Sequence, residues 1–427
     1  MTFKRKLSPT ERFYISCDDF NAEETATCVV NQMVLEGQGD IDIAAWQKAV
    51  TQASESLQGT RFRLSGKLGF SHWSDAGITT QLEVIRGLNW DGMSDEAAPF
   101  LNRPLDVKTS TGCEVLLVIG EASGKHHIIF RTHHAVMDGR GTKTFADEVL
   151  RALRQQTLQG DNSFVRDVDL AKSVTSLPGD KVSDTVAAPT GVPLGRDFGS
   201  SWLRRTLPGS YKQVLANAGI SVAKLANIYS DSPVRIQLPV DLRMHDTDIV
   251  STGNLTGGLL MQVSPMTTTA DWAKQIRLKI ADLEHARMPQ FAGIPTLNVL
   301  NWVPLNWLKK FNDKLALKRQ ETGQYRTSGI ISNLGFLKVD EYSAAGFNCT
   351  SVFFIPPYFN TTALFLVLAG NKDSVEVILR IPHQLSSNGR AEHALSQICH
   401  GICYGHEEHV AQVASIKNQA QPIKQAS

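Results

Sequence analysis

Two adjacent histidines stand in the stretch RTHHAVMDGRG, residues 131–141, with an aspartate four residues after the second histidine and a glycine directly after that. An imidazole is the side chain best suited to move a proton near neutral pH, because its unperturbed pKa is close to the working pH. His134 could therefore take a proton from a hydroxyl, amine or thiol as that group attacks a carbonyl. A charged turn after a buried strand is the alternative interpretation, and these residues alone leave both open.

Asp138 and Gly139 suggest how such a histidine could be supported. A histidine that acts as a base needs its ring held in one tautomer by a hydrogen bond to its other nitrogen. Asp138 could make that bond, as in a catalytic triad, or it could point away and pair with an arginine. We favour the arginine. Gly139 would permit a positive φ or a close backbone approach, so that a substrate could pass near the chain.

The elements around the motif place it in a strand-to-helix connection. The apolar run KHHIIFRT (125–132) predicts a strand, and TKTFADEVLRALRQQ (142–156) has helical periodicity. A connection of this kind can present a side chain to a cleft from a rigid scaffold. The rest of this half predicts a helix over 41–57 and strands in the runs TRFRLSG, QLEVIRG and CEVLLVIG.

The second half repeats the mixture of strands and helices. Its sequence predicts a helix pair over 209–229 broken near Gly219, a long helix over 269–288, and a final helix over 391–415. Predicted strands are PVRIQLPVDL, LTGGLLMQVSP, SGIISNLGFLKV, TSVFFIPP, TALFLVLAG and VEVILRIP. We therefore expect an α/β protein with an N-terminal lobe over 1–165, a crossover linker rich in Ser, Asp, Thr, Gly and Pro over 166–199, and a C-terminal lobe over 200–427.

Length and composition agree with two lobes. The chain has 42% hydrophobic and 20% charged residues, so it can bury a sizeable core. Its length of 427 residues exceeds what one hydrophobic core usually supports. The 43 basic and 42 acidic residues give no net field to attract nucleic acid. No run is long enough for a membrane span and no apolar segment follows the basic N-terminus, so we expect a cytoplasmic protein. The six cysteines are too sparse for a disulfide framework.

The heptapeptide HHAVMDG (133–139) resembles the HHxxxDG motif of the chloramphenicol-acetyltransferase-like superfamily. That superfamily includes condensation domains of nonribosomal peptide synthesis, polyketide-associated acyltransferases and many CoA-dependent acyltransferases. Further segments resemble it in the same order along nearly the whole chain: KLSPTERFY, RPLDV, PVDLR with GNLTGG, and SNLG. A DFG at 197–199 differs from the DFGWG of plant-type members in position and continuation, and we take it as accidental.

The resemblance implies two chloramphenicol-acetyltransferase-like lobes arranged in a V, with the active-site channel between them. It implies that His134 is the catalytic histidine and that His133 has a structural role. It also implies that Asp138 pairs with an arginine of the second lobe, for which Arg243 in PVDLR is the matching position. The physical argument given above for Asp138 likewise favours an arginine as its partner.

An acyltransferase is the expected function. His134 would act as general base while a hydroxyl or amine acceptor attacks the thioester of an acyl-CoA or an acyl-carrier protein, with no permanently bound cofactor. The developing oxyanion needs donors, for which Ser332, Asn333, Thr256 and the backbone N–H of Gly139 are candidates by location. The alternatives are a free-standing condensation enzyme that joins carrier-bound substrates, and an inactive module that recruits carriers. The expected partners are a small-molecule acceptor and possible carrier proteins, in secondary metabolism.

Two weaker patterns could indicate a function but also fit ordinary structural roles. Cys399, Cys403 and His406 fall at helical spacings that could bind a metal, but no second ligand cluster completes a zinc pattern, so we predict no metal. The segment 298–320 carries Trp302 and Trp307 before a basic face, which is typical of an interfacial helix or a lipid-tunnel mouth. We take packing in the core or between the lobes as the default for this segment, with membrane contact as the alternative.

Overall fold

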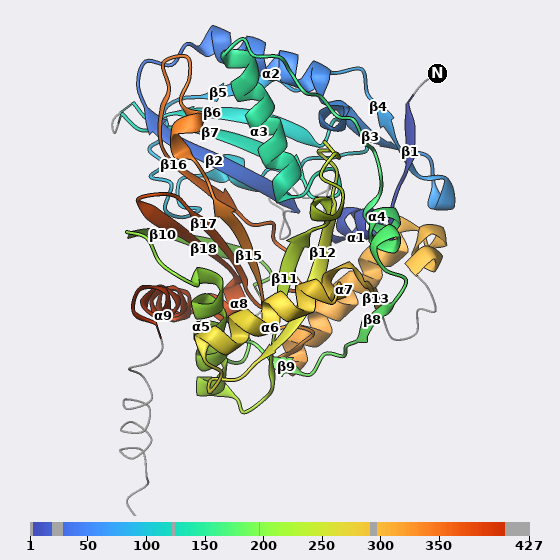
Figure 1. Ribbon diagram of the computed structural model, residues 1–427, viewed down its shortest axis with the longest axis vertical. Helices are drawn as coiled ribbons and strands as arrows, with labels where there is room; N and C mark the ends of the chain where they lie inside the picture. The colour runs from blue at the N-terminus through green and yellow to red at the C-terminus, as the bar shows by residue number, and fades with distance from the viewer. Residues whose placement is uncertain (1–2, 19–28, 122–123, 196, 291–296, 406–427) are drawn as a thin grey trace, which may run out of the picture.

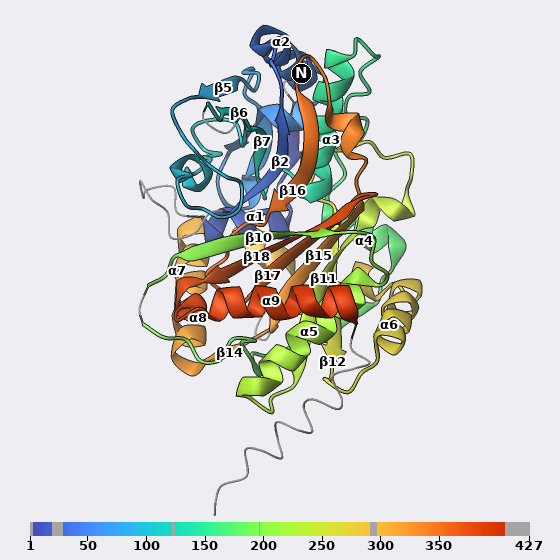
Figure 2. The same cartoon turned by 90° about the vertical axis from the view of Figure 1, so that its left-hand side faces the viewer.

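The computed structural model describes residues 3–18, 29–121, 124–195, 197–290 and 297–405 (Figure 1). The chain forms two large mixed sheets, each covered by helices (Figures 1 and 2). The first sheet has the order β16 (Asn348–Ile355), β2 (Val30–Gln38), β7 (His126–His133), β6 (Cys113–Ile119) and β5 (Leu82–Ile85). The second sheet has the order β10 (Ser200–Pro208), β18 (Ser374–Pro382), β17 (Phe365–Gly370), β15 (Gly329–Phe336), β11 (Val234–Asp241) and β12 (Thr256–Val263).

Helices cover the outer faces of these sheets. In the first half, α2 (Ile43–Ser56) and α3 (Gly139–Leu153) pack on each other, and α3 contacts β2 and β7. In the second half, α5 (Val214–Tyr229) lies between α6 (Thr269–Ala281) and α9 (Arg390–Tyr404) (Figure 2). None of the described helices combines the length and the apolar character that a membrane crossing requires.

Shorter elements connect and close the two halves. The helices are α1 (Pro9–Cys17), α4 (Asp167–Val174), α7 (Leu305–Thr322) and α8 (His383–Ser386), of which α1 packs against α7. The remaining strands form small sheets: β1 (Lys4–Lys6), β4 (His72–Asp75) and β3 (Phe62–Ser65); β13 (Met288–Gln290) and β8 (Pro178–Lys181); β14 (Gln324–Tyr325) and β9 (Val186–Ala187). The predicted linker 166–199 thus contains α4, β8 and β9.

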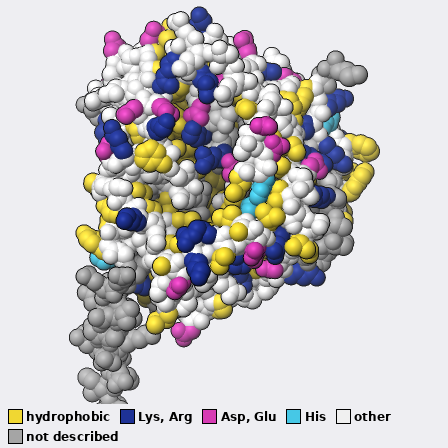
Figure 3. Space-filling model, viewed as in Figure 1, with side chains coloured by type: hydrophobic (Ala, Val, Ile, Leu, Met, Phe, Trp, Pro, Cys, Tyr) yellow, Lys and Arg dark blue, Asp and Glu magenta, His cyan; other side chains and the backbone are white. Residues whose placement is uncertain are grey.

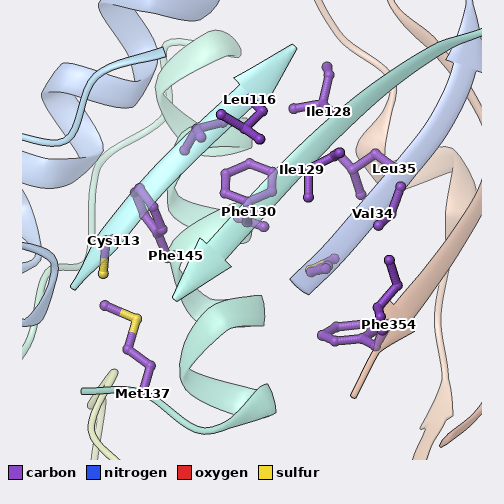
Figure 4. Packing of buried hydrophobic residues seen from close by; sticks show 14 of the residues in the cluster. Val34, Leu35, Cys113, Leu116, Ile128, Ile129, Phe130, Met137, Phe145 and Phe354 are labelled. Atoms are coloured by element: carbon purple, nitrogen blue, oxygen red, sulfur yellow. The ribbon is translucent and has the colours of Figure 1, made fainter. Parts of the chain in front are cut away.

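The core of the first half holds the strand that leads to the motif. Phe130 of β7 and Phe145 of α3 are both fully buried and meet edge to face, with ring centroids 5.4 Å apart (Figure 4). Met137 of the motif is buried in the same cluster. The continuous buried run of the strand and the helical spacing in α3 therefore anchor the connection from both sides.

Three features differ from the sequence-based expectations. Strand β16 leaves the second half of the chain and pairs with β2 of the first sheet, so the first sheet includes residues from beyond the predicted boundary at 199. Helix α5 runs unbroken through Gly219, where a Cβ would lie only 2.2 Å from the Trp272 ring. That glycine permits close helix packing and does not end the helix. Helix α6 ends at Ala281, before the predicted end at 288.

Candidate active site

The connection between β7 and α3 is fixed by burial and by a helix cap. Ala135, Val136 and Met137 have no exposed surface, so the residues between His134 and Asp138 anchor the connection in the core. Asp138 caps α3, because its Oδ1 accepts the backbone N–H of Gly141 at 2.7 Å. These contacts hold the side chains of the two histidines and the aspartate in set directions.

His133 is fully buried and has both ring nitrogens engaged. Its Nδ1 accepts the backbone N–H of Ala135 at 3.0 Å, and its Nε2 lies 3.1 Å from the Asp18 carboxylate. The bond at Nδ1 places the proton of a neutral ring on Nε2, facing Asp18. His133 is not among the residues that line the large cavity of the molecule.

His134 lines that cavity and is held along one edge of its ring. The Asn254 Nδ2 atom donates to the His134 carbonyl at 2.8 Å and lies 3.3 Å from its Nδ1. The ring stacks on Tyr14, with centroids 4.3 Å apart and an interplanar angle of 17°. Its Nε2 has no hydrogen-bond partner among the residues that the structure describes. The Nδ1 edge therefore belongs to the protein, while Nε2 is available to a molecule in the cavity.

The surroundings keep the His134 imidazole neutral. Burial lowers its pKa to about 4, although a hydrogen bond to its own backbone and the negative charge of Asp138 act in the opposite direction. At neutral pH the ring is uncharged, so one nitrogen carries a lone pair that can accept a proton.

Asp138 and Arg243 form an ion pair between the two halves. Arg243 Nη1 lies 3.1 Å from Asp138 Oδ2, which also accepts the Leu255 backbone N–H at 2.8 Å and the Thr256 hydroxyl at 2.9 Å. Arg243 further binds Asp241 at 2.8 Å. Burial would raise the pKa of Asp138, but the charge of Arg243 and these hydrogen bonds hold it below its usual value. The Asp138 carboxylate is thus saturated by contacts with the start of α3 and with the second half, which is the arrangement favoured over a triad.

The candidate oxyanion donors differ in whether their hydrogen-bond donors are already engaged within the protein. Ser332 and Asn333 on β15 line the cavity together with His134 and Gly139. The Asn333 Oδ1 accepts the Gly335 N–H at 3.1 Å, which leaves its amide hydrogens for other partners. Thr256 also lines the cavity, and its hydroxyl donates to Asp138 at 2.9 Å. The Gly139 N–H is the first of α3 and has no acceptor within the helix.

The close backbone approach predicted at Gly139 occurs two residues later. Gly139 does not adopt a positive φ, and a Cβ there would have only ordinary contact with Leu334, at 3.6 Å. At Gly141 a Cβ would lie 1.9 Å from the Thr252 carbonyl oxygen. The second half therefore packs directly on the first turn of α3, and Gly141 is the residue that permits it.

The cavity has a volume of about 1270 Å³ and is lined by residues from both halves of the chain. One part of its wall is apolar: Trp307 and Phe311 of α7 line it although their exposed fractions are 65% and 60%. Figure 3 shows hydrophobic side chains gathered along the right-hand edge of this face. Trp302, 59% exposed, adds to this apolar surface. The segment 353–360 contributes Phe354, Ile355, Pro356, Pro357 and Phe359 to the lining.

Among the described residues, no group of three or more His, Cys, Asp or Glu side chains could hold a metal ion. Cys399 and Cys403 lie on α9, whereas His406 is outside the described residues.

Solved structures share this fold over nearly the whole chain. The condensation domain of the monacolin K polyketide synthase MokA superposes with a TM-score of 0.65 at 12% identity, covering 95% of this chain and 99% of that one. The first condensation domain of the calcium-dependent antibiotic synthetase, in complex with a substrate analogue, gives 0.64 at 14% identity, with 95% and 97% covered. A mutant starter condensation domain of the rhizomide synthetase RzmA, in complex with C8-CoA, gives 0.61 at 14%, with 94% and 95% covered.

The chain therefore shares the fold of these condensation domains, and the predicted α/β fold class is confirmed. No protein-family model and no curated protein gives a significant match to the sequence. This shared fold and the cavity lined by both halves are the two findings on which a function can be proposed.

Several contacts at the site were not predicted from the sequence. Tyr14 and Asn254 contact the His134 ring, and Asp18 faces His133. Gly141 allows the second half of the chain to pack on the first turn of α3. Tyr14 and Asn254 do stand in segments that carry the resemblance, KLSPTERFY and GNLTGG. The sequence did offer a signal for Gly141, because a second glycine follows Gly139 so closely in DGRG. Asp18 offered no signal, because its contact depends on a long-range approach of the chain.

Proposed function

We propose that the protein transfers an acyl group from a thioester to a hydroxyl or amine acceptor, with His134 as the general base. The observation that carries the proposal is the His134 ring at the cavity wall, held along its Nδ1 edge and unpartnered at Nε2. The condensation-domain fold adds support, since a neighbour with this fold is described in complex with C8-CoA.

The reaction needs one base and no covalent enzyme intermediate. In the tautomer that carries its proton on Nδ1, Nε2 of His134 takes the proton of the acceptor as its oxygen or nitrogen attacks the thioester carbonyl. The Asn254 amide then keeps its hydrogen bond to the His134 carbonyl. The tetrahedral intermediate collapses by loss of the thiolate, which receives the proton back from His134. The Gly139 N–H and the Ser332 hydroxyl are our candidates to stabilise the oxyanion, a contribution of about 3 kcal/mol for each well-placed donor. Asp138 and Arg243 hold the lobes in register and take no part in proton transfer.

The apolar wall of the cavity favours a lipophilic acyl group. A chain that lies along Trp307 and Phe311 would remove apolar surface from water, at about 0.8 kcal/mol for each buried CH2 group. We therefore expect kcat/KM to rise from acetyl-CoA to octanoyl-CoA. Carrier-bound acyl groups are the alternative donors, and the carrier would then be a separate protein.

A free-standing condensation enzyme is the second candidate. It would form an amide between an acyl or aminoacyl thioester and an amine. The neighbour described in complex with both C8-CoA and Leu-SNAC supports this version. A module that only recruits carriers is the third candidate, and it predicts carrier binding without turnover.

Intact-mass and free-thiol assays test the proposal. The purified protein is incubated with octanoyl-CoA, or with an octanoyl carrier protein, in the presence of a panel of alcohols and amines. We expect thiol release together with an acylated acceptor, and loss of both in His134→Ala. Hydrolysis or transfer that is unchanged in His134→Ala would contradict the proposal. Carrier binding with no turnover of any thioester would favour the recruiting module.

A further inference from the structure

Asp167 is a buried carboxylate to which the proposed reaction gives no role. It is the first residue of α4, it is 5% exposed, and it lines the same cavity as His134. Its Oδ1 atom is buried and has no hydrogen-bond partner among the described residues. Buried polar atoms nearly always find a partner, because an unmade hydrogen bond costs free energy. Asp167 is therefore a carboxyl group of the cavity wall whose hydrogen bonding within the protein is incomplete.

Asp167 differs from the other acidic residues of the cavity wall. Each of the others that is not fully exposed forms an ion pair with a basic side chain: Asp138 and Asp241 with Arg243, Asp184 with Arg319, and Glu284 with Lys279. Among the described residues Asp167 forms none. The adjacent Arg166 binds Asp169 instead, through hydrogen bonds of 2.6 and 2.9 Å.

Asp167 also lies close to the proposed base. Tyr14 stacks on the His134 ring, and the negative charge of Asp167 adds to burial in raising the pKa of the Tyr14 hydroxyl. Thr10 and Tyr14 of α1 line the cavity beside Asp167. A bound molecule can therefore touch Asp167 and His134 along one wall, with Tyr14 between α4 and the imidazole.

We propose that Asp167 forms a subsite for a primary ammonium group of the acceptor. The inference rests on the proposed function, because it takes this cavity as the acceptor site. An ammonium group supplies a positive charge and three hydrogen-bond donors, which would compensate a carboxylate that has no basic partner among the described residues. The acceptor is then an amino alcohol or a diamine, whose second group reaches His134 and receives the acyl chain.

The ionisation of Asp167 agrees with this assignment. Burial raises its pKa to about 6, although the nearby Thr10 and Ser8 side chains act in the opposite direction. The charged form of the Asp167 carboxyl group is thus poorly stabilised by the protein alone. A bound cation would lower that pKa, so charge on the carboxylate and binding of the ammonium group favour each other.

Calorimetric titration with two probes of equal length tests the subsite. We expect the wild-type protein to bind n-hexylammonium at least about tenfold more tightly than hexan-1-ol, which corresponds to about 1.4 kcal/mol. Asp167→Asn removes the charge at nearly constant shape and should abolish the preference. Asp169→Asn, two residues further along the same helix, is the matched control and should keep it. Equal binding of both probes by the wild type, or a preference that survives Asp167→Asn, would overturn the proposal.

A second variant and one further comparison complete the test. Asp167→Ser removes the carboxylate at a position where serine is compatible with the start of a helix, and it serves if Asp167→Asn does not fold. His134→Ala should keep the amine preference while losing acyl transfer. A wild type that prefers the amine but transfers no acyl group would refute the proposed function and leave the subsite intact. Transfer without any preference for the amine would refute the subsite alone.

Discussion

Two buried ion networks join the lobes, and they differ in what they border. The site network, Asp138 with Arg243, lies at the cavity beside His134. The seam network is centred on Arg204 of β10, which binds Glu36 of β2 at 3.0 Å and Glu376 of β18 at 2.8 Å. None of the three residues of the seam network lines the cavity.

The difference shows that charge buried between lobes is not by itself a sign of function. Both networks place charged groups out of water, which is tolerable only when every partner is present. The seam network holds β16 as well, because Arg204 donates to Ser351 at 3.0 Å and lies over the Phe353 ring at 3.8 Å. It therefore secures the strand that crosses between the lobes. The site network also joins the two lobes, but it does so beside His134.

Arg243→Met should have the largest effect in this comparison. It leaves Asp138 buried without its cation, which costs about 3–5 kcal/mol of folding stability. It should also lower acyl transfer for each folded molecule, because Asp138 fixes both the start of α3 and Leu255. Urea denaturation and the thiol-release assay measure the two effects. The double variant with Asp138→Asn should recover part of the stability. Unchanged stability in Arg243→Met would contradict a structural role for the site network.

Arg204→Met should cost similar stability and little else. It leaves Glu36 and Glu376 without their shared partner, a loss of about 3–5 kcal/mol. Because the seam network does not touch the cavity, the transfer rate corrected for the folded fraction should be unchanged. A loss of transfer in fully folded Arg204→Met would remove the distinction between the networks.

The pH dependence of transfer should reflect His134. Its pKa is lowered to about 4, so the neutral, active form predominates throughout neutral pH and is lost as the pH falls through about 4. We expect kcat/KM to be level from pH 6 to 8, without the inflection near 6.5 that an unperturbed histidine gives. Far-UV circular dichroism at each pH separates this loss from acid unfolding. An inflection near 6.5 that is carried by His134 would refute the burial argument.

Thr256→Val should have the smallest effect and decides between two roles for that hydroxyl. As a donor to Asp138, its loss costs about 1 kcal/mol of stability and leaves transfer nearly intact. As an oxyanion donor, its loss would reduce kcat roughly 100-fold or more. Stability and kcat measured on the same preparation distinguish the two outcomes.

The sequence predicted local structure well where apolar periodicity was strong. The helix expected over 41–57 is α2, Ile43–Ser56, and the run KHHIIFRT ends β7 at the motif. Periodicity does not identify the partner of a strand, so the pairing of β16 with β2 could not be predicted. The unbroken α5 was missed for a related reason, since only the tertiary contact with Trp272 explains Gly219.

The candidate site was predictable only in part. The motif and its resemblance pointed to His134, Asp138 and Arg243; His134 and Asp138 line one cavity, and Arg243 binds Asp138. Tyr14 and Asp167 reach the same cavity from distant parts of the chain, and Asn254 contacts the His134 ring. Only the resemblance of their segments marks Tyr14 and Asn254, and nothing in the local sequence marks Asp167. Thr256 lies where expected, but its hydroxyl is bound to Asp138, a detail of bonding that position along the chain does not reveal.

Chemical rescue of His134→Ala tests the central claim most directly. The variant should fold with unchanged stability and lose about 100-fold to 10,000-fold in transfer, the range for a positioned acid-base group. Because the ring lines a cavity of about 1270 Å³, added imidazole can occupy the vacated space. We predict that imidazole restores a measurable part of the lost rate in proportion to its unprotonated fraction. Wild-type turnover in the unrescued variant would show that another group accepts the proton.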